Sequence, residues 1–150
     1  APRIHRHMVH MVGEQDAGDL TQQAFLRAFR KIDQFGGRSQ FLTWLFRLAT
    51  NEALQHLRRN RCRLMPALQH EPVEHSPPTA VAVAQKELLE TALEQIDPEL
   101  RSLFLLREVE GLSYEQLAEA TNVPAGTVGS RLNRARRDLK QRLVALGWEQ

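Results

Sequence analysis

Prolines divide this chain into two parts. Four of its seven prolines lie within residues 66–78, in the stretch PALQHEPVEHSPP. Proline has no backbone N–H to donate, and it disfavours helix in the residue before it. The stretch also lacks the regular spacing of apolar residues with which a helix buries one face. We therefore predict a linker over residues 66–79, with one domain in residues 1–65 and another in residues 80–150.

Apolar residues before the linker recur at three- and four-residue spacing, which is typical of helices. The pattern predicts a helix over residues 16–33 and a shorter, weakly patterned helix over residues 3–12. The sequence FGGR at residues 35–38 interrupts the pattern. Ser39 is placed to cap the helix that follows, because its side chain can accept a hydrogen bond from a free amide, and we expect that helix to end near Arg59.

The part after the linker also reads as a series of helices. Pro98 stands at a first-turn position that tolerates proline, and Ser113 with Gln116 matches a capping box. Gly111 is expected to stop one helix, and residues 122–124 to form a turn. Strand alternation of useful length is missing, so the predicted fold class is all-α, with two small helical domains. The expected helices cover residues 80–95, 97–110, 114–121 and 125–146.

Charge is distributed unevenly, although the net charge is only +2. Residues 1–65 carry eleven Lys/Arg against five Asp/Glu, residues 66–100 carry one against seven, and residues 101–150 carry eight against six. Basic ends around an acidic middle suggest two separate surfaces that bind anions. Solvated helix faces are the alternative explanation for each basic run.

Several classes of protein are disfavoured by what the sequence lacks. No apolar run approaches the ~20 residues of a membrane-spanning helix, and the polar start shows no signal peptide. Cys62 is the only cysteine, which fits a cytoplasmic protein. No phosphate-binding loop, nucleophile elbow or clustered carboxylate pair is visible, so we expect neither an enzyme nor a cofactor. His5 and His7 do not share a helix face, so these two with His10 and Cys62 are not expected to bind metal.

Residues 114–146 have the arrangement of a helix-turn-helix. Leu117, Ala118, Val123, Val128 and Leu132 are expected where the two helices pack. The second helix would then present polar and basic side chains away from that core, as reading of the major groove requires. A basic amphipathic helix of a bundle, or one that binds a membrane surface or an acidic partner, is the alternative. The expected outward residues are Thr127, Ser130, Arg131, Asn133, Arg134 and Arg137.

Residues 16–59 place aromatic residues beside basic ones. Single-stranded DNA is bound by such surfaces, because rings stack on exposed bases and cations contact the phosphates. A base removed from the duplex also needs a pocket. Phe29, Phe41 and Trp44 are each expected to be core residues rather than stacking residues. Phe35, in the predicted loop, is the better candidate for stacking.

These segments resemble parts of the bacterial extracytoplasmic-function (group 4) RNA polymerase sigma factors. DAGDLTQQAFLRAFR with GRSQFLTWLFRLATN is similar to the family's region 2, and LREVEGLSYEQLAEATNVPAGTVGSRLNRARRDL is similar to its region 4. The resemblance implies a protein that binds core RNA polymerase and promoter DNA, both duplex and single-stranded. Region 2 would recognise the minus-ten element and help to open the DNA, and region 4 would recognise the minus-thirty-five element. An anti-sigma factor is implied as a further partner.

The resemblance also implies roles for individual residues. The surface that docks on the polymerase is matched by Asp16, Asp19, Gln22, Phe25 and Leu26. The positions matched to the minus-ten strand are Phe35, Arg38, Ser39, Arg47, Asn51, Arg58 and Arg59. The positions matched to the minus-thirty-five duplex are Thr127, Ser130, Arg131, Arg134 and Arg136.

Two features depart from the family pattern. Gly129 stands early in the recognition helix, where family members commonly carry Lys or Arg. Glycine there costs about 1 kcal/mol of helix stability and removes a DNA contact. The chain also begins at Ala1-Pro2, where the family would be partway through its first helix, so we expect that helix to be truncated.

Two other functions remain open from the sequence. One is a helix-turn-helix regulator whose N-terminal domain senses a ligand. It predicts tight binding to duplex DNA without polymerase, and a ligand pocket within residues 1–65. The other is a small helical hydrolase or metal enzyme, which predicts a catalytic or metal-binding cluster.

Overall fold

The computed structural model describes residues 2–63 and 80–149. Within these ranges the chain is all-α, as predicted, and contains no strand. The elements are α1 (Pro2–Val12), α2 (Glu14–Arg30), the 3-10 turn η1 (Ile32–Gln34), α3 (Phe41–Arg63), α4 (Ala80–Gln95), α5 (Pro98–Glu108), α6 (Tyr114–Thr121) and α7 (Ala125–Ala145). The predicted linker, residues 66–79, lies entirely outside the described residues.

Local signals in the sequence set most of the helix ends. The Asp97 carboxylate accepts a hydrogen bond from the Glu99 amide at the start of α5. At the start of α6, the Ser113 hydroxyl accepts from the Gln116 amide, and the Gln116 side chain accepts from the Ser113 amide. This reciprocal pair is the predicted capping box. Asn122, with φ 55°, ends α6 in a left-handed conformation that asparagine tolerates better than most residues.

Both ends of α2 and of α3 differ from the prediction. Ser39 does not cap α3, because the helix begins at Phe41 and the first helical carbonyl belongs to Gln40, which accepts from the Trp44 amide. α3 also continues to Arg63, one turn beyond the expected end. α2 begins at Glu14 and ends at Arg30, and η1 takes the last part of the predicted helix.

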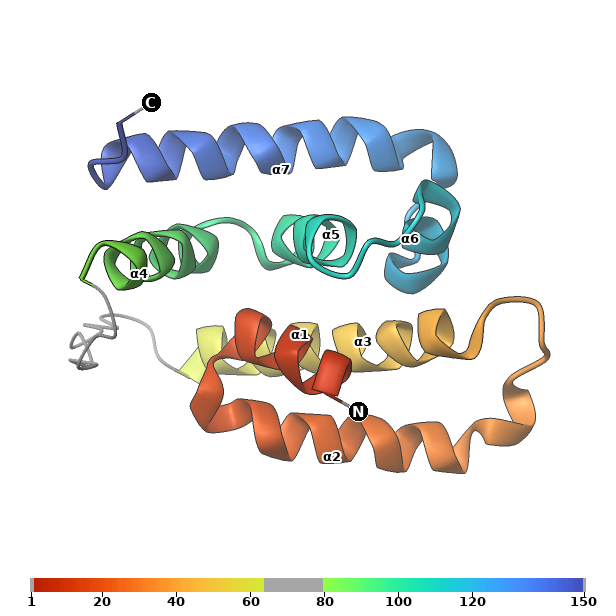
Figure 1. The fold of residues 1–150 in the computed structure, drawn as a ribbon. Helices are drawn as coiled ribbons and strands as arrows, with labels where there is room; N and C mark the ends of the chain where they lie inside the picture. The colour runs from red at the N-terminus through yellow and green to blue at the C-terminus, as the bar shows by residue number, and fades with distance from the viewer. Residues whose placement is uncertain (1, 64–79, 150) are drawn as a thin grey trace.

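The first half packs α1 across α2 and α3 (Figure 1). Ile4, Met8 and Phe46 are fully buried there, so the weakly patterned first helix contributes much of this core. His7 is also buried and shares a 3.1 Å hydrogen bond with the Thr50 hydroxyl. Burial lowers the pKa of His7 to about 3, so its ring is neutral at physiological pH.

The second half surrounds α5, which lies between α4, α6 and α7 (Figure 1). Leu103 and Leu106 of α5 pack with Leu117 of α6 and Leu132 of α7, and all four are almost completely buried. Burial of such side chains contributes about 1.5–3 kcal/mol each. This packing holds α6 and α7 at a fixed angle.

A buried arginine joins the turn between α4 and α5 to the first half. The Arg101 guanidinium donates to the carbonyls of Leu93, Glu94 and Ile96, at 2.6, 3.0 and 3.3 Å. It also donates to the Met11 carbonyl at the end of α1, at 2.8 Å. Burial lowers the pKa of Arg101 from its ordinary value, but four accepting carbonyls compensate the charge.

The two halves lie against each other as two layers (Figure 1). α1 contacts α5, and α3 contacts both α5 and α6. Polar links between the layers include Gln116 to Gln40 at 3.3 Å and Arg58 to Glu99 at 3.1 Å. The chain is therefore folded into one closed body in this structure.

Candidate nucleic-acid interface

The outer face of α7 is basic and exposed. Val128, Leu132, Ala135 and Leu139 form its buried side, and the six residues expected to point outward are all exposed, from Thr127 to Arg137. The orientation predicted for a recognition helix is confirmed. A helix with short polar residues near its start and arginines further along can place both against a DNA groove.

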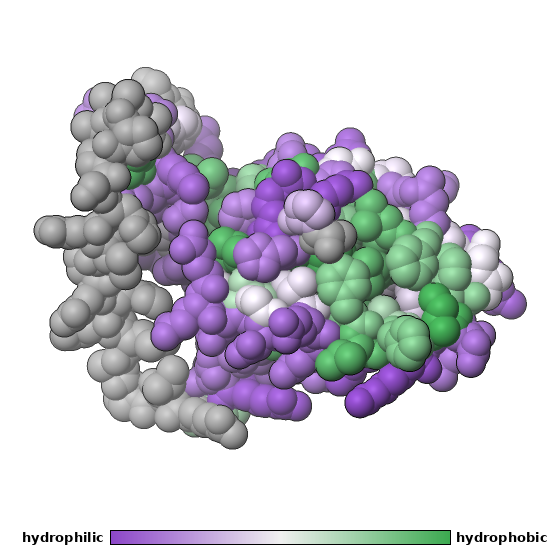
Figure 2. All heavy atoms as spheres, turned by 60° about the horizontal axis from the view of Figure 1, so that its bottom comes forward, coloured by the Kyte–Doolittle hydropathy of each residue, from purple (hydrophilic) through white to green (hydrophobic). Residues whose placement is uncertain are grey.

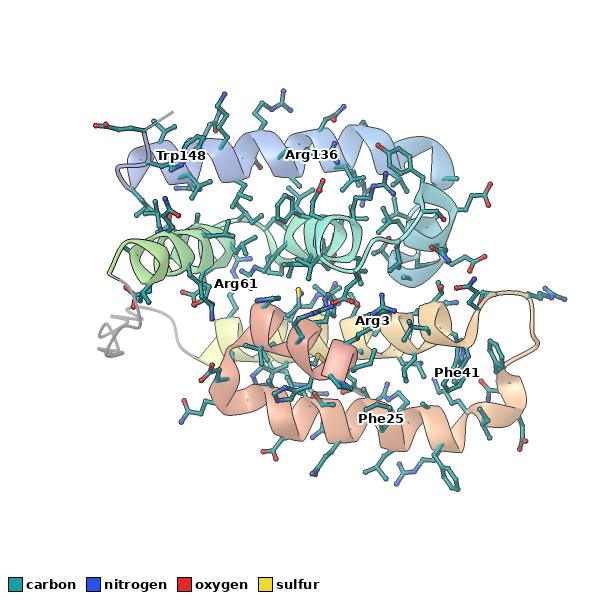
Figure 3. All side chains as sticks on the ribbon, viewed as in Figure 1. Arg3, Phe25, Phe41, Arg61, Arg136 and Trp148 are labelled. Carbon is teal, nitrogen blue, oxygen red and sulfur yellow. The ribbon has the colours of Figure 1, made fainter. Side chains whose placement is uncertain are left out.

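Not every arginine of this face is equally available. Arg136 is half-buried on the side of α7 towards α5, and it pairs with Glu108 at 2.7 Å (Figure 3). The hydrogen bond to Glu108 raises the pKa of Arg136 above its ordinary value. Arg134 lies 3.9 Å from Asp138, a long and exposed pair. Arg131 and Arg134 are therefore freer than Arg136 to contact phosphates or bases.

Tyr114, which the sequence did not single out, lies beside Gly129. A Cβ at Gly129 would meet the Tyr114 ring at 3.6 Å, an ordinary contact distance, so packing does not require glycine there. The ring is 43% exposed, and the Arg107 guanidinium lies 5.2 Å from its centroid. Because Gly129 has no side chain, the surface at this point of α7 is formed by the Tyr114 ring of α6.

A second basic face runs along α3. Arg47, Asn51 and Arg58 recur at four- and seven-residue spacing, which places them on one side of the helix, and all three are exposed. Arg59 is also exposed but lies further round the helix. Arg58 is engaged by Glu99 of the second half.

A cleft of about 340 Å³ lies between the start of α3 and the end of α6. Arg38, Ser39 and Arg47 line one wall together with Thr43 and Trp44. The opposite wall comes from α6 and the residue after it, namely Ala118, Glu119 and Asn122. Three residues matched to the minus-ten strand thus line a cleft that faces the second half of the chain, although Arg38 and Arg47 remain exposed to solvent.

Aromatic rings cluster at the entry to α3. Phe35 packs against Phe41 and Trp44, with ring centroids 5.6 and 5.3 Å away. Phe35 and Trp44 are half-buried, but Phe41 is 47% exposed and Phe29 on α2 is 80% exposed. The expectation that Phe29 and Phe41 are core residues was wrong. Spacing on a helix predicts an apolar face, but it does not tell whether the same chain covers that face.

The exposed part of this region forms an apolar patch. It consists of Leu26 and Phe29 on α2, Ile32 in η1 and Phe41 on α3. Figure 2 shows hydrophobic side chains gathered on this face of the molecule. A contiguous patch of this kind commonly marks a surface that binds another protein.

The residues matched to polymerase docking lie along α2. Asp19, Gln22 and Leu26 are exposed, and Phe25 is half-buried (Figure 3). Asp16 is half-buried and lies 3.1 Å from His56 of α3, so this carboxylate also ties α2 to α3. The docking residues and the apolar patch share one side of the first half, since Leu26 belongs to both.

Metal binding finds no support in the part of the chain that the structure describes. His7 is buried against Thr50, Cys62 is exposed, and no three potential ligands come together among the described residues. None of the described helices is long and apolar enough to cross a membrane.

Comparison with known proteins identifies both halves. The family model for sigma-70 region 2 matches residues 1–63, and that for sigma-70 region 4 matches residues 86–139. The ECF RNA polymerase sigma-E factor of Escherichia coli K12 is 34% identical over an alignment of 144 positions, which covers 87% of this chain and 75% of the relative. That of Haemophilus influenzae is 34% identical over an alignment of 152 positions, gaps included, which covers 93% of this chain and 80% of the relative.

Solved structures show the same fold. The sigma factor RpoE of Bartonella quintana, in complex with the anti-sigma factor NepR, superposes with a TM-score of 0.73 at 24% identity. The match covers 98% of this chain and 92% of that one. CnrH, in complex with the cytosolic domain of CnrY, gives 0.70 at 22% identity, covering 95% and 81%.

Proposed function

This chain belongs to the extracytoplasmic-function sigma factors of the sigma-70 family, and on that premise we propose how its two basic faces work. Bound to core RNA polymerase, α7 reads the minus-thirty-five duplex and α3 with its preceding loop holds the minus-ten strand. Residues 1–65 and 80–150 would be the two promoter-binding domains. A ligand-sensing domain in residues 1–65 is not needed, because region 2 accounts for residues 1–63.

One observation supports this proposal most strongly. The chain carries two exposed basic helix faces, and they differ in chemistry. The face of α7 itself consists of short polar residues and arginines, which suits an intact groove. The face of α3 lies beside three aromatic rings and carries Asn51, whose amide can both donate to and accept from a base edge. Unpaired bases need rings and amides of this kind.

Promoter opening would follow from differential binding. A flipped base can enter a site that the stacked duplex cannot reach, so the site binds only the open form. Binding of that form shifts the melting equilibrium towards it. Phosphate contacts by arginine supply affinity, and base contacts supply choice. The chain then performs no covalent chemistry and requires no cofactor, and it acts in the cytoplasm, where the polymerase transcribes.

Docking on the polymerase is assigned to the outer side of α2. Leu26→Ala is expected to weaken binding to core polymerase about tenfold, because a leucine side chain buried at an interface contributes on the order of 1.5 kcal/mol. Titration of fluorescently labelled protein with core polymerase measures this affinity.

Leu89→Ala is the matched control, since Leu89 is an exposed leucine of α4 outside the docking surface. Its affinity should equal that of the wild type. Equal weakening by both substitutions, or no binding of the unmodified chain, would count against docking through α2.

Control by an anti-sigma factor is proposed on the basis of relatives. The structure of the Bartonella quintana factor contains the anti-sigma factor NepR, and that of CnrH contains the cytosolic domain of CnrY. The apolar patch on α2, η1 and α3 offers a surface of suitable chemistry, because it is exposed in the free chain. An inhibitor that covered this patch would compete with the polymerase.

Recognition of duplex DNA by α7 predicts a salt effect. Arg134→Ala should weaken binding to minus-thirty-five duplex DNA and reduce the slope of log K against log [salt] by about one unit, because one phosphate contact is lost. Binding measured by fluorescence anisotropy between low and moderate salt gives the slope. Arg30→Ala removes an exposed arginine of α2 and should leave the slope unchanged. An unchanged slope for Arg134→Ala would mean that this side chain faces solvent in the complex.

A further inference from the structure

An aromatic ring lies uncovered beside the start of α7. The Tyr114 ring of α6 is 43% exposed, and its Cε2 atom lies 3.6 Å from the place that a Cβ at Gly129 would occupy. Gly126, three residues earlier and next to Gly129 on the helix surface, also has no side chain, and a Cβ there would meet nothing within 4 Å. For about one turn, therefore, α7 places no side chain of its own over the ring.

This gap lies at the end of α7 that meets the bases. In a helix-turn-helix, the N-terminal residues of the recognition helix contact base edges. Gly126 and Gly129 stand in the first two turns of α7, and the neighbouring Thr127 and Ser130 are exposed. The sequence thus combines short polar side chains with an apolar surface at the point where a base edge would approach.

Two arginines hold the ring in place. The Arg107 guanidinium lies 5.2 Å from the ring centroid, and it donates to the Leu112 carbonyl at 2.8 Å. Arg136 hydrogen-bonds to Glu108 and also to Tyr114, and both hydrogen bonds raise the pKa of Arg136 above its ordinary value. A ring that is already fixed in the free protein loses little conformational entropy when it binds a base.

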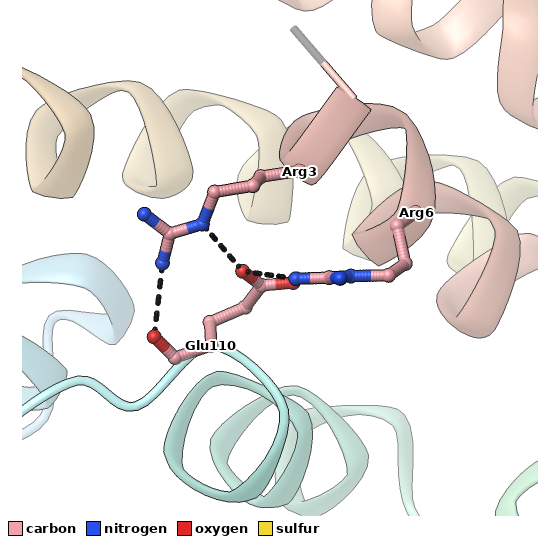
Figure 4. A network of polar contacts seen from close by, with 3 residues as sticks. All are labelled: Arg3, Arg6 and Glu110. Atoms are coloured by element: carbon pink, nitrogen blue, oxygen red, sulfur yellow. Dashed lines mark hydrogen bonds and ion pairs between the residues drawn. The ribbon is translucent and has the colours of Figure 1, made fainter.

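The turn that leads into α6 is fixed as well. Glu110 in this turn accepts hydrogen bonds from Arg3 and Arg6 of α1, at 2.9 and 3.0 Å (Figure 4). Ser113 then caps α6 through its reciprocal hydrogen bonds with Gln116. Tyr114 is the first residue of α6, so these contacts give its ring a defined position beside α7.

We propose that the Tyr114 ring, left uncovered by Gly126 and Gly129, recognises a thymine of the minus-thirty-five element through its 5-methyl group. Thymine is the base that presents a methyl group in the major groove, and apolar side chains recognise it by contact. A Lys or Arg at position 129 would instead offer a charge to phosphate or guanine. The inference deepens the function proposed above and rests on it, since it needs α7 to read duplex DNA.

Replacing thymine by deoxyuridine tests this contact, because deoxyuridine keeps the base pairing and removes only the 5-methyl group. Selection of random duplexes on the chain, followed by sequencing, first gives the element that it binds. Each thymine of that element is then replaced in turn, and fluorescence anisotropy measures the affinity. One replacement should weaken binding about fourfold, because burial of one methyl-sized group contributes about 0.8 kcal/mol.

Variants of the ring and of the gap identify the source of the preference. Tyr114→Ala should bind the thymine and deoxyuridine duplexes equally, whereas Tyr114→Phe should keep the preference, because the ring remains. Gly129→Ala should also abolish the preference, since its Cβ would stand against the ring where the thymine methyl group would lie.

Gly129→Ala also separates recognition from folding. Alanine favours helix over glycine and would meet the ring at an ordinary contact distance, so this variant should melt at a higher temperature than the wild type. Gly18→Ala is the matched control, because Gly18 is an exposed glycine within α2 whose Cβ would meet nothing within 4 Å. It should melt at a higher temperature too, but it should keep the preference for thymine over deoxyuridine.

Two results would overturn the recognition of thymine by Tyr114. One is equal binding by the wild type whichever thymine of the element is replaced. The other is a preference for thymine that persists in Tyr114→Ala or in Gly129→Ala. A chain that enriches no common element from the random duplexes would contradict the proposed reading of DNA by α7 itself, and the inference would fall with it.

Discussion

Replacing Asn51 by alanine should lower the equilibrium constant for promoter opening about thirtyfold, a loss of about 2 kcal/mol in the open complex. Asn51 is exposed on α3, on the same side as Arg47. An amide that makes paired hydrogen bonds to a base edge contributes roughly 1–3 kcal/mol. The duplex does not offer this contact, so its loss raises the free energy of the open form alone. Binding to core polymerase, which is assigned to α2, should change by no more than about twofold.

Permanganate footprinting of unpaired thymines measures opening, and titration with core polymerase measures docking. Gln95→Ala is the matched control, because Gln95 is an exposed amide at the end of α4, outside the face of α3. Its equilibrium constant for opening should stay near that of the wild type. If Asn51→Ala reduces opening and polymerase binding by the same factor, Asn51 does not hold the minus-ten strand.

Replacing Arg101 by alanine should lower the free energy of unfolding by about 3–5 kcal/mol. The guanidinium satisfies four backbone carbonyls, three around the turn between α4 and α5 and one at Met11. Alanine would leave these buried acceptors without their donor and would create a cavity. Such a loss is a large fraction of the 5–15 kcal/mol that stabilises a typical domain.

Urea denaturation followed by circular dichroism measures this stability. Arg101→Met should lose nearly as much as Arg101→Ala, because methionine fills the space but donates no hydrogen bond. Arg30→Ala, at an exposed position of α2, should change the free energy of unfolding by less than about 0.5 kcal/mol. A loss below about 1 kcal/mol for Arg101→Ala would mean that water or other donors replace the guanidinium.

Local sequence signals predicted the helices and their ends well, because the chemistry that sets them is local. Asp97 with Pro98, and Ser113 with Gln116, act within one turn of chain, and the structure shows these interactions. Ser39 was a weaker signal. Gly36 and Gly37 before it leave the first residue of the following helix undetermined, and α3 begins two residues after Ser39.

Long-range contacts were not predictable from the sequence. Glu110 meets Arg3 and Arg6 across more than a hundred residues of chain, and no spacing rule connects them. Arg101 stands in a run of leucines, and its position on α5 does not reveal that a turn and another helix supply its acceptors. The burial of α1 was underestimated, although Ile4, Met8 and Met11 recur at four- and three-residue spacing on one face of the helix; only the burial of His7 on that face has no signal in the sequence.

The candidate site was predictable in part. The outward residues of α7 follow from helix geometry once the buried side is known, and they point outward as expected. Phe29 and Phe41 could not be assigned, since an apolar side chain looks the same in a sequence whether its partner is the same chain or another protein. Tyr114 was missed because its importance depends on the neighbouring Gly129 and Arg107 in space.

Transcription by reconstituted polymerase tests the central claim most directly. Core polymerase, with and without the purified chain, would transcribe genomic DNA, and the 5′ ends of the products would be sequenced. The sigma function predicts a new set of start sites that appears only with the chain and shares two sequence elements upstream, about 25 base pairs apart. Start sites identical to those of core polymerase alone would contradict it.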